Sequence, residues 1–125
     1  MKNLVIEKTF NSPHVNFNNR TGIMHIEGRS IPEDPGDFFG QMYDWIEEYF
    51  EDPAELTKFE IQLDYINSGS SKYLLEFFRR IKKKYDAGND VIVNWYYEED
   101  DESVLELGEH YKENVEIPIK LIECN

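Results

Sequence analysis

Strand-like and helix-like segments alternate through the second half of the sequence, and few folds accommodate this order. Apolar and polar residues alternate over Thr57–Ile66, which is typical of a strand with one buried face and one wet or partner-facing one. An apolar stripe at helical spacing follows between Leu74 and Tyr85 and ends at Gly88, and a β-rich run covers Val91–Tyr97. Because strands joined by a helix usually pair in parallel, this half predicts crossover connections.

The first third of the sequence predicts short antiparallel strands instead. Apolar residues at Leu4–Ile6, Val15–Phe17 and Ile23–Ile26 are separated by turn-forming stretches. A helix is expected to begin at Asp34-Pro35, because proline is tolerated at the first helical position. Its apolar stripe runs over Phe38–Phe50 and stops before Pro53.

The last quarter predicts one more helix and one more strand, over Ser103–Lys112 and Ile117–Ile122. No linker, repeat or low-complexity segment interrupts the 125 residues, so residues 1–125 are expected to form a single domain. The expected fold class is α/β, with a mixed β-sheet and helices packed on it. Its N-terminal part is antiparallel, and strands and helices alternate after it.

Charge and cysteine content exclude several classes of partner. Acidic residues outnumber basic ones 26 to 13, for a formal net charge of −13, which repels nucleic-acid backbones and anionic membranes. The single cysteine, Cys124, permits no intramolecular disulfide, which favours a reducing cytoplasmic location. No apolar run is long enough for a signal peptide or a membrane span, so we expect a cytoplasmic protein.

Catalytic and cofactor motifs give the chain little support as an enzyme. His14, His25 and His110 lack the spacing of metal ligands, and no phosphate-binding glycine loop or Gly-x-Ser-x-Gly elbow is present, so neither a metal nor a cofactor is expected. The acidic run Glu98–Glu102 is interpreted as a solvated loop that favours the start of the following helix. A small acidic metal-dependent enzyme that uses this run is the alternative from a different class.

The junction between the strand over Thr57–Ile66 and the next helix gathers three hydroxyls, those of Ser68, Ser70 and Ser71. Together with Asn67 they are expected to form a polar turn over Asn67–Ser71, and Ser and Asn at this position suit the capping of exposed helix N–H groups. The same position suits a phosphoserine, because a phosphate is stabilised by free N–H groups and by the positive end of the helix dipole. Both a cap and a phosphorylation switch therefore fit the junction.

Three segments, Gly28–Pro35, Leu63–Lys72 and Trp95–Asp101, resemble the SiaC-type regulatory phosphoproteins of bacterial biofilm signalling. The resemblance covers nearly the whole chain and implies a STAS-like fold, similar to anti-sigma-factor antagonists. It also implies a non-enzymatic switch that is phosphorylated by an anti-sigma-factor-type protein kinase and reset by a PP2C-like phosphatase. The unphosphorylated form would bind and activate a diguanylate cyclase.

Carried over to this sequence, the resemblance assigns the phosphate acceptor to Ser68. The usual family pattern is Asn-Thr-Ser-Ser-Ser-Lys, and here Ser68 replaces its threonine and Gly69 the next serine, so Ser70 and Ser71 remain alternative acceptors. Partner-binding roles are expected for Arg29, Asn67, Gly69 and Lys72. A turn-stabilising hydrogen bond is the alternative role of Arg29, Trp95–Tyr97 are expected mostly in the core, and a constitutive scaffold is the plainer alternative function.

Overall fold

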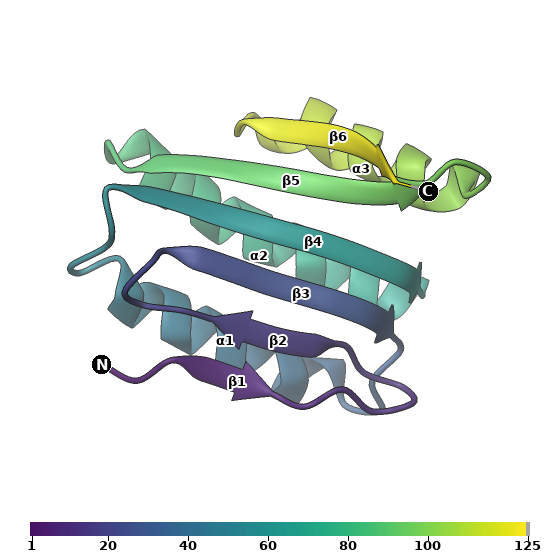
Figure 1. Cartoon of the computed structure of the whole chain (residues 1–125), viewed down its shortest axis with the longest axis horizontal. Helices are drawn as coiled ribbons and strands as arrows, with labels where there is room; N and C mark the ends of the chain where they lie inside the picture. Colours follow the sequence, from purple (N-terminus) through teal and green to yellow (C-terminus); the bar gives the residue numbers. More distant parts are fainter. Residues whose placement is uncertain (125) are drawn as a thin grey trace.

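The computed structural model describes residues 1–124 as a six-stranded sheet with its helices on one face (Figure 1). The strands are β1 (Leu4–Ile6), β2 (His14–Phe17), β3 (Ile23–Ser30), β4 (Leu56–Ile66), β5 (Asp90–Glu98) and β6 (Ile119–Cys124). The helices are α1 (Pro35–Tyr49), α2 (Ser68–Asp86) and α3 (Glu102–Val115). All the expected elements are present, within a few residues of their expected ends.

The order of the strands in the sheet follows their order in the sequence. β1, β2 and β3 pair antiparallel, whereas β3, β4, β5 and β6 pair parallel to their neighbours. Each parallel pair is joined by one helix, so three consecutive crossovers place α1, α2 and α3 side by side behind the sheet (Figure 1). The mixed α/β architecture expected from the alternation is therefore confirmed.

The core lies between the sheet and the helices and is rich in aromatic rings. Phe77 of α2 is fully buried and packs edge-on against Phe59 of β4 at 5.6 Å between ring centroids. Phe78 contacts Trp95 of β5 and Tyr111 of α3 in the same way. α2 thus anchors the middle of the sheet and holds its own N-terminus in a fixed place at the end of β4.

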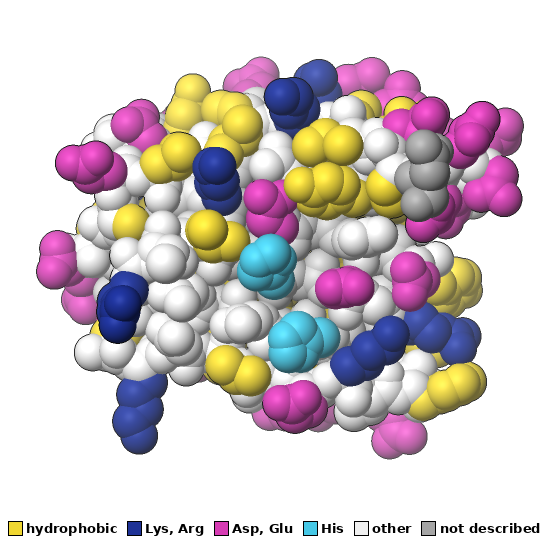
Figure 2. All heavy atoms as spheres, in the orientation of Figure 1, with side chains coloured by type: hydrophobic (Ala, Val, Ile, Leu, Met, Phe, Trp, Pro, Cys, Tyr) yellow, Lys and Arg dark blue, Asp and Glu magenta, His cyan; other side chains and the backbone are white. Residues whose placement is uncertain are grey.

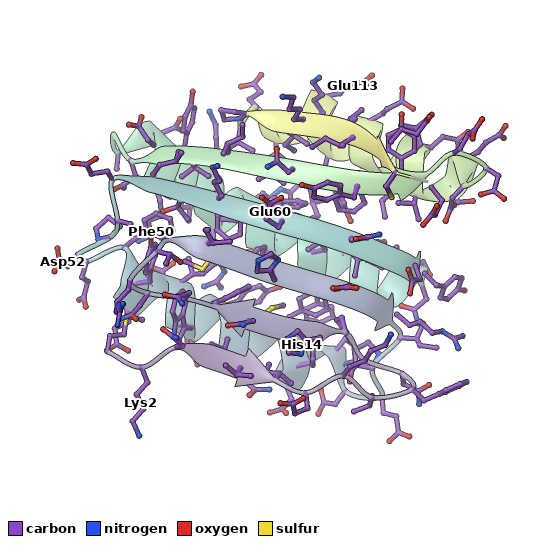
Figure 3. The ribbon with its side chains drawn as sticks, in the orientation of Figure 1. Lys2, His14, Phe50, Asp52, Glu60 and Glu113 are labelled. Atoms are coloured by element: carbon purple, nitrogen blue, oxygen red, sulfur yellow. The ribbon has the colours of Figure 1, made fainter. Side chains whose placement is uncertain are left out.

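Within residues 1–124, no helix lies on the opposite face of the sheet, and the side chains of this face are mixed polar and apolar (Figures 2 and 3). His25 of β3 pairs in register with Glu60 of β4, and the Tyr96 hydroxyl donates a 2.9 Å hydrogen bond to that carboxylate. Trp95 is buried as expected, but the expectation that Tyr96 lies in the core is wrong, because no second layer formed by the described residues covers this face. The wet or partner-facing side expected for the strand over Thr57–Ile66 lies on this open face.

A bulge corrects a second expectation, because the alternation over Thr57–Ile66 predicts Tyr65 on the same buried face as Phe59 and Leu63. Leu63 pairs with Gly28, but the next pair joins Tyr65 to Arg29, so Asp64 is an extra residue in β4. One extra residue reverses the alternation of faces, and the Tyr65 side chain is 51% exposed. The bulge lies only four residues before Ser68, and it therefore shapes the end of the strand that leads into α2.

Candidate functional site

A pocket of about 370 Å³ lies where β4 ends and where α2 and α3 begin. Its lining comes from three neighbouring segments of the fold: Asp64, Tyr65, Ile66, Asn67, Ser68, Ser71, Asp101, Ser103, Val104 and Leu107. The carboxyl ends of parallel strands are the usual place for binding in open α/β sheets, because loops and helix N-termini converge there. We therefore treat this pocket and the adjoining first turn of α2 as the candidate site.

The first turn of α2 is capped by Asn67 and not by a serine. The Asn67 side-chain oxygen accepts a 2.8 Å hydrogen bond from the Ser70 amide, and its carbonyl accepts one from the Ser71 amide. The expected polar turn over Asn67–Ser71 is therefore wrong, because the helix already begins at Ser68. The signal for capping was correct, but the asparagine alone satisfies it and leaves the serine hydroxyls for other roles.

The serine hydroxyls of this turn have different surroundings. Ser70 is 1% exposed and its hydroxyl is buried, so a phosphate cannot be accommodated there without disrupting the helix–sheet contact. The Ser71 hydroxyl donates a 2.9 Å hydrogen bond to the Ser68 carbonyl, and the residue is only partly exposed. Ser68 is exposed, lies at the rim of the pocket, and its hydroxyl has no hydrogen-bond partner within residues 1–124.

Opposing electrostatic effects meet at Ser68. The amides of Ser68 and Gly69 make no hydrogen bond within the described part of the chain, so two N–H donors and the positive end of the α2 dipole are available to an anion. The pocket itself is lined by Asp64 and Asp101, with no lysine or arginine among its lining residues. An anion at Ser68 is therefore favoured at the helix terminus and disfavoured on the pocket side.

The structure brings together only some of the residues expected from the sequence. Asn67, Ser68 and Ser71 line the pocket, whereas Gly69 and Lys72 are exposed on the first turns of α2 outside it. Arg29 lies in β3, and its guanidinium stacks over the Phe10 ring at 4.7 Å. It therefore makes a cation–π contact, and the turn-stabilising hydrogen bond given as its alternative role is not found within residues 1–124.

The start of α3 forms the part of the site that was not expected. Asp101 is the N-cap of α3, and its side chain accepts a 3.1 Å hydrogen bond from the Val104 amide. The acidic run around it indicated a helix start, as found. α2 and α3 begin beside one pocket because β4 and β5 are paired in parallel. The sequence predicted parallel strands in general, but it did not predict this particular pair.

Other reactive groups lie away from this pocket. Burial, together with the nearby Glu98 carboxylate, raises the pKa of the Cys124 thiol, which disfavours the reactive thiolate. Within residues 1–124, no group of three or more His, Cys, Asp or Glu side chains is arranged to hold a metal ion. None of the helices in this range is long and apolar enough to cross a membrane.

A mixed sheet with helices on one face, and a pocket at the carboxyl ends of its parallel strands, places the chain among the open-sheet α/β proteins. Comparison with known proteins identifies the family within this class. Residues 6–124 match the model of the SiaC family of regulatory phosphoproteins, and the chain belongs to this family.

Solved structures of SiaC from Pseudomonas aeruginosa share this fold. The apo form is 27% identical, with a TM-score of 0.89 over 98% of this chain and 99% of that one. SiaC in complex with the diguanylate cyclase SiaD, whose activator it is, is 26% identical, with a TM-score of 0.90 over 97% and 99% of the chains. An uncharacterised protein of P. aeruginosa strain UCBPP-PA14 is 27% identical over 97% of this chain and 96% of its own length.

Proposed function

We propose that this chain is a phosphorylation-controlled activator of a diguanylate cyclase, and that Ser68 is its switch. The unphosphorylated form binds the cyclase, an anti-sigma-factor-type kinase adds the phosphate, and a PP2C-like phosphatase removes it. Membership of a family of regulatory phosphoproteins supports a modified residue in the chain. The SiaC structure solved with SiaD supports a cyclase as the effector.

The observation that carries the assignment to Ser68 is the difference between the serine hydroxyls at the junction. The Ser68 hydroxyl alone is both exposed and free of hydrogen bonds within residues 1–124, whereas Ser70 is buried and Ser71 is bonded to the backbone. A kinase must reach the hydroxyl oxygen and remove its proton, which only the first of these three permits. Two free amides beside it stabilise the phosphate that results.

The expected sign of the switch follows from charge. The chain carries a formal net charge of −13, and Asp64 and Asp101 already line the pocket beside Ser68. A phosphate adds about −2 at the same place, and a docking surface built around a neutral hydroxyl loses affinity when that charge must be desolvated. Phosphorylation is therefore expected to release the effector.

Phosphosite mapping tests the assignment directly. We expect one phosphate on the wild-type chain and on Ser71→Ala, and none on Ser68→Ala, after incubation with an anti-sigma-factor-type kinase of the same host. Intact-mass measurement and peptide mapping give the result, and thermal unfolding checks that each variant folds. Ser71→Ala is the matched control, because it removes a hydroxyl from the same helical turn. Full phosphorylation of Ser68→Ala would contradict the assignment.

A further inference from the structure

Basic residues are concentrated on α2 in an otherwise acidic chain. The helix carries six of the 13 lysines and arginines but only two of the 26 acidic residues. Half of these cations are neutralised locally by carboxylates, in the pairs Arg80–Glu76 at 3.0 Å, Lys82–Asp86 at 2.9 Å and Lys84–Glu47 at 2.9 Å. The other three, Lys72, Arg79 and Lys83, are exposed and make no ion pair within residues 1–124.

These three unpaired cations form one line on the helix, which we call the α2 stripe (Lys72, Arg79 and Lys83). Ser68 and the three cations follow one another at intervals of four, seven and four residues. At 3.6 residues per turn, these intervals keep all four side chains within about 60° of arc around the helix. The line is about 22 Å long at 1.5 Å per residue, and it begins at Ser68. It lies opposite the buried face formed by Leu74, Phe77, Phe78 and Ile81.

The position of α2 leaves this stripe open. The helix is the middle one of the layer behind the sheet, with α1 and α3 on its two sides (Figure 1). Its inner face packs on the sheet, so its outermost line faces away from the rest of the molecule. The chain has a net charge of −13, so carboxylates that could pair with cations are abundant. The three cations of the α2 stripe nevertheless make no ion pair within residues 1–124.

From this geometry we infer that the α2 stripe is the docking surface for an acidic α-helix of the effector protein. The inference rests on the proposed function and specifies the chemistry of the partner. A single line of cations about three turns long matches a line of carboxylates at similar spacing on a second helix. Nucleic acid and anionic membranes fit less well, because the remaining surface of the chain repels an extended polyanion.

The same stripe explains how one phosphate controls docking. Lys72 lies four residues after Ser68, so a phosphate on Ser68 is within reach of the Lys72 ammonium on the same face of the helix. The carboxylates of Asp64 and Asp101 disfavour the pocket side for the phosphate. A phosphate of about −2 therefore cancels most of the +3 of the stripe and removes its attraction for an acidic helix.

Charge reversal tests the inference, with a diguanylate cyclase as the probe: SiaD of P. aeruginosa, or a cyclase of the chain's own host. We expect Arg79→Glu/Lys83→Glu to weaken binding by about tenfold or more in titrations at 150 mM salt. The matched control is Lys58→Glu/Lys120→Glu, which changes the net charge equally on the open face of the sheet. The control is expected to bind within about threefold of the wild-type chain.

Salt dependence provides a second measurement that requires no variant. We expect wild-type affinity to fall steeply as salt rises from 50 to 500 mM, and the salt dependence of Arg79→Glu/Lys83→Glu to be shallower. Circular dichroism confirms that both double variants retain their helices. Equal affinities of the stripe variant and the control would overturn the inference and leave the proposed function intact.

Other occupants of the stripe give different results. Dimerisation of the wild-type chain that Arg79→Glu/Lys83→Glu abolishes would show that a second copy binds there, and would overturn the inference. Binding of the wild-type chain to phosphatidylglycerol vesicles, lost in the same variant, would likewise overturn it in favour of a membrane. Failure of the unphosphorylated wild-type chain to bind any of the cyclases would overturn the proposed function, and this inference with it.

Discussion

Gly108 has the tightest surroundings of any helical glycine in the chain. A Cβ at this position would lie 2.5 Å from Cδ1 and 2.6 Å from Nε1 of the Trp95 indole. That indole is fixed by a 2.9 Å hydrogen bond to the Val104 carbonyl in α3. The close approach of α3 to β5, which forms one wall of the candidate pocket, therefore depends on the absence of a side chain at Gly108.

Substitution of two helical glycines, Gly108 and Gly40, tests this packing. Gly108→Ala is expected to lower the free energy of unfolding by about 1–3 kcal/mol, because the methyl group overlaps a ring that cannot move freely. Gly40→Ala in α1 is the matched control: nothing lies within 4 Å of its Cβ, so we expect stabilisation by about 0.5–1 kcal/mol. Urea unfolding followed by tryptophan fluorescence measures both. A neutral Gly108→Ala would show that α3 does not approach β5 so closely.

The choice among the serines of the junction could be predicted only in part from the sequence. The family resemblance assigned the phosphate acceptor to Ser68, but the residues of the junction themselves did not distinguish it from Ser70 and Ser71. The distinction depends on which residue caps the helix and on which face each hydroxyl lies. Both follow from the start of α2 at Ser68, one residue after the cap at Asn67.

Between elements, one hydrogen bond joins α3 to the first turn of α2. The Tyr111 hydroxyl donates a 3.0 Å hydrogen bond to the Ser71 carbonyl. Burial raises the pKa of the Tyr111 phenol. Burial and the nearby Glu76 carboxylate likewise raise the pKa of Tyr43, to about 12. The contact thus ties the two helices that flank the candidate pocket, and it requires a protonated tyrosine.

Alkaline unfolding tests this contact. In the unfolded chain a tyrosine loses its proton near pH 10, whereas Tyr111 in the folded chain retains its proton to higher pH. The contribution of Tyr111 to stability is therefore present below pH 10 and is lost as the pH rises above 10. At pH 8, Tyr111→Phe is expected to cost about 0.5–1.5 kcal/mol through the lost hydrogen bond. At pH 10.5 the gap between wild type and variant should narrow by about 1 kcal/mol.

Urea unfolding at pH 8 and pH 10.5 gives these values. The matched control is Tyr65→Phe, at a residue that is exposed and whose hydroxyl makes no hydrogen bond within the described residues. It should leave the stability at pH 8 within about 0.5 kcal/mol of wild type. A gap between wild type and Tyr111→Phe that stays the same at both pH values would contradict a protonated, buried Tyr111.

The elements themselves were largely predictable, because hydrophobic periodicity is a local signal. The helix over Phe38–Phe50 and the strand over Thr57–Ile66 were both found near their expected limits. The bulge at Asp64 was not predictable, since it depends on pairing with β3 across the sheet. Tyr96 was misplaced because a β-rich run looks the same whether a second layer covers its far face or not.

For the whole molecule, the order of strands and helices predicted the mixed sheet but not the pocket. Three successive crossovers place all helices on one face, and this arrangement brings the starts of α2 and α3 together. The concentration of positive charge on α2 is visible in the sequence, but the pairing of these cations is not. Which cations are left unpaired depends on ion pairs such as Lys84–Glu47, which joins residues of different helices.

Control of diguanylate cyclase binding by one phosphate on Ser68 can be measured in a single titration. The wild-type chain, before and after full phosphorylation at Ser68, is titrated into the cyclase at one salt concentration. We expect the phosphorylated form to bind at least about tenfold more weakly, since about two negative charges are added beside Lys72 and the acidic pocket. Equal affinities of the two forms would contradict the account and would leave a scaffold whose serines have no regulatory role.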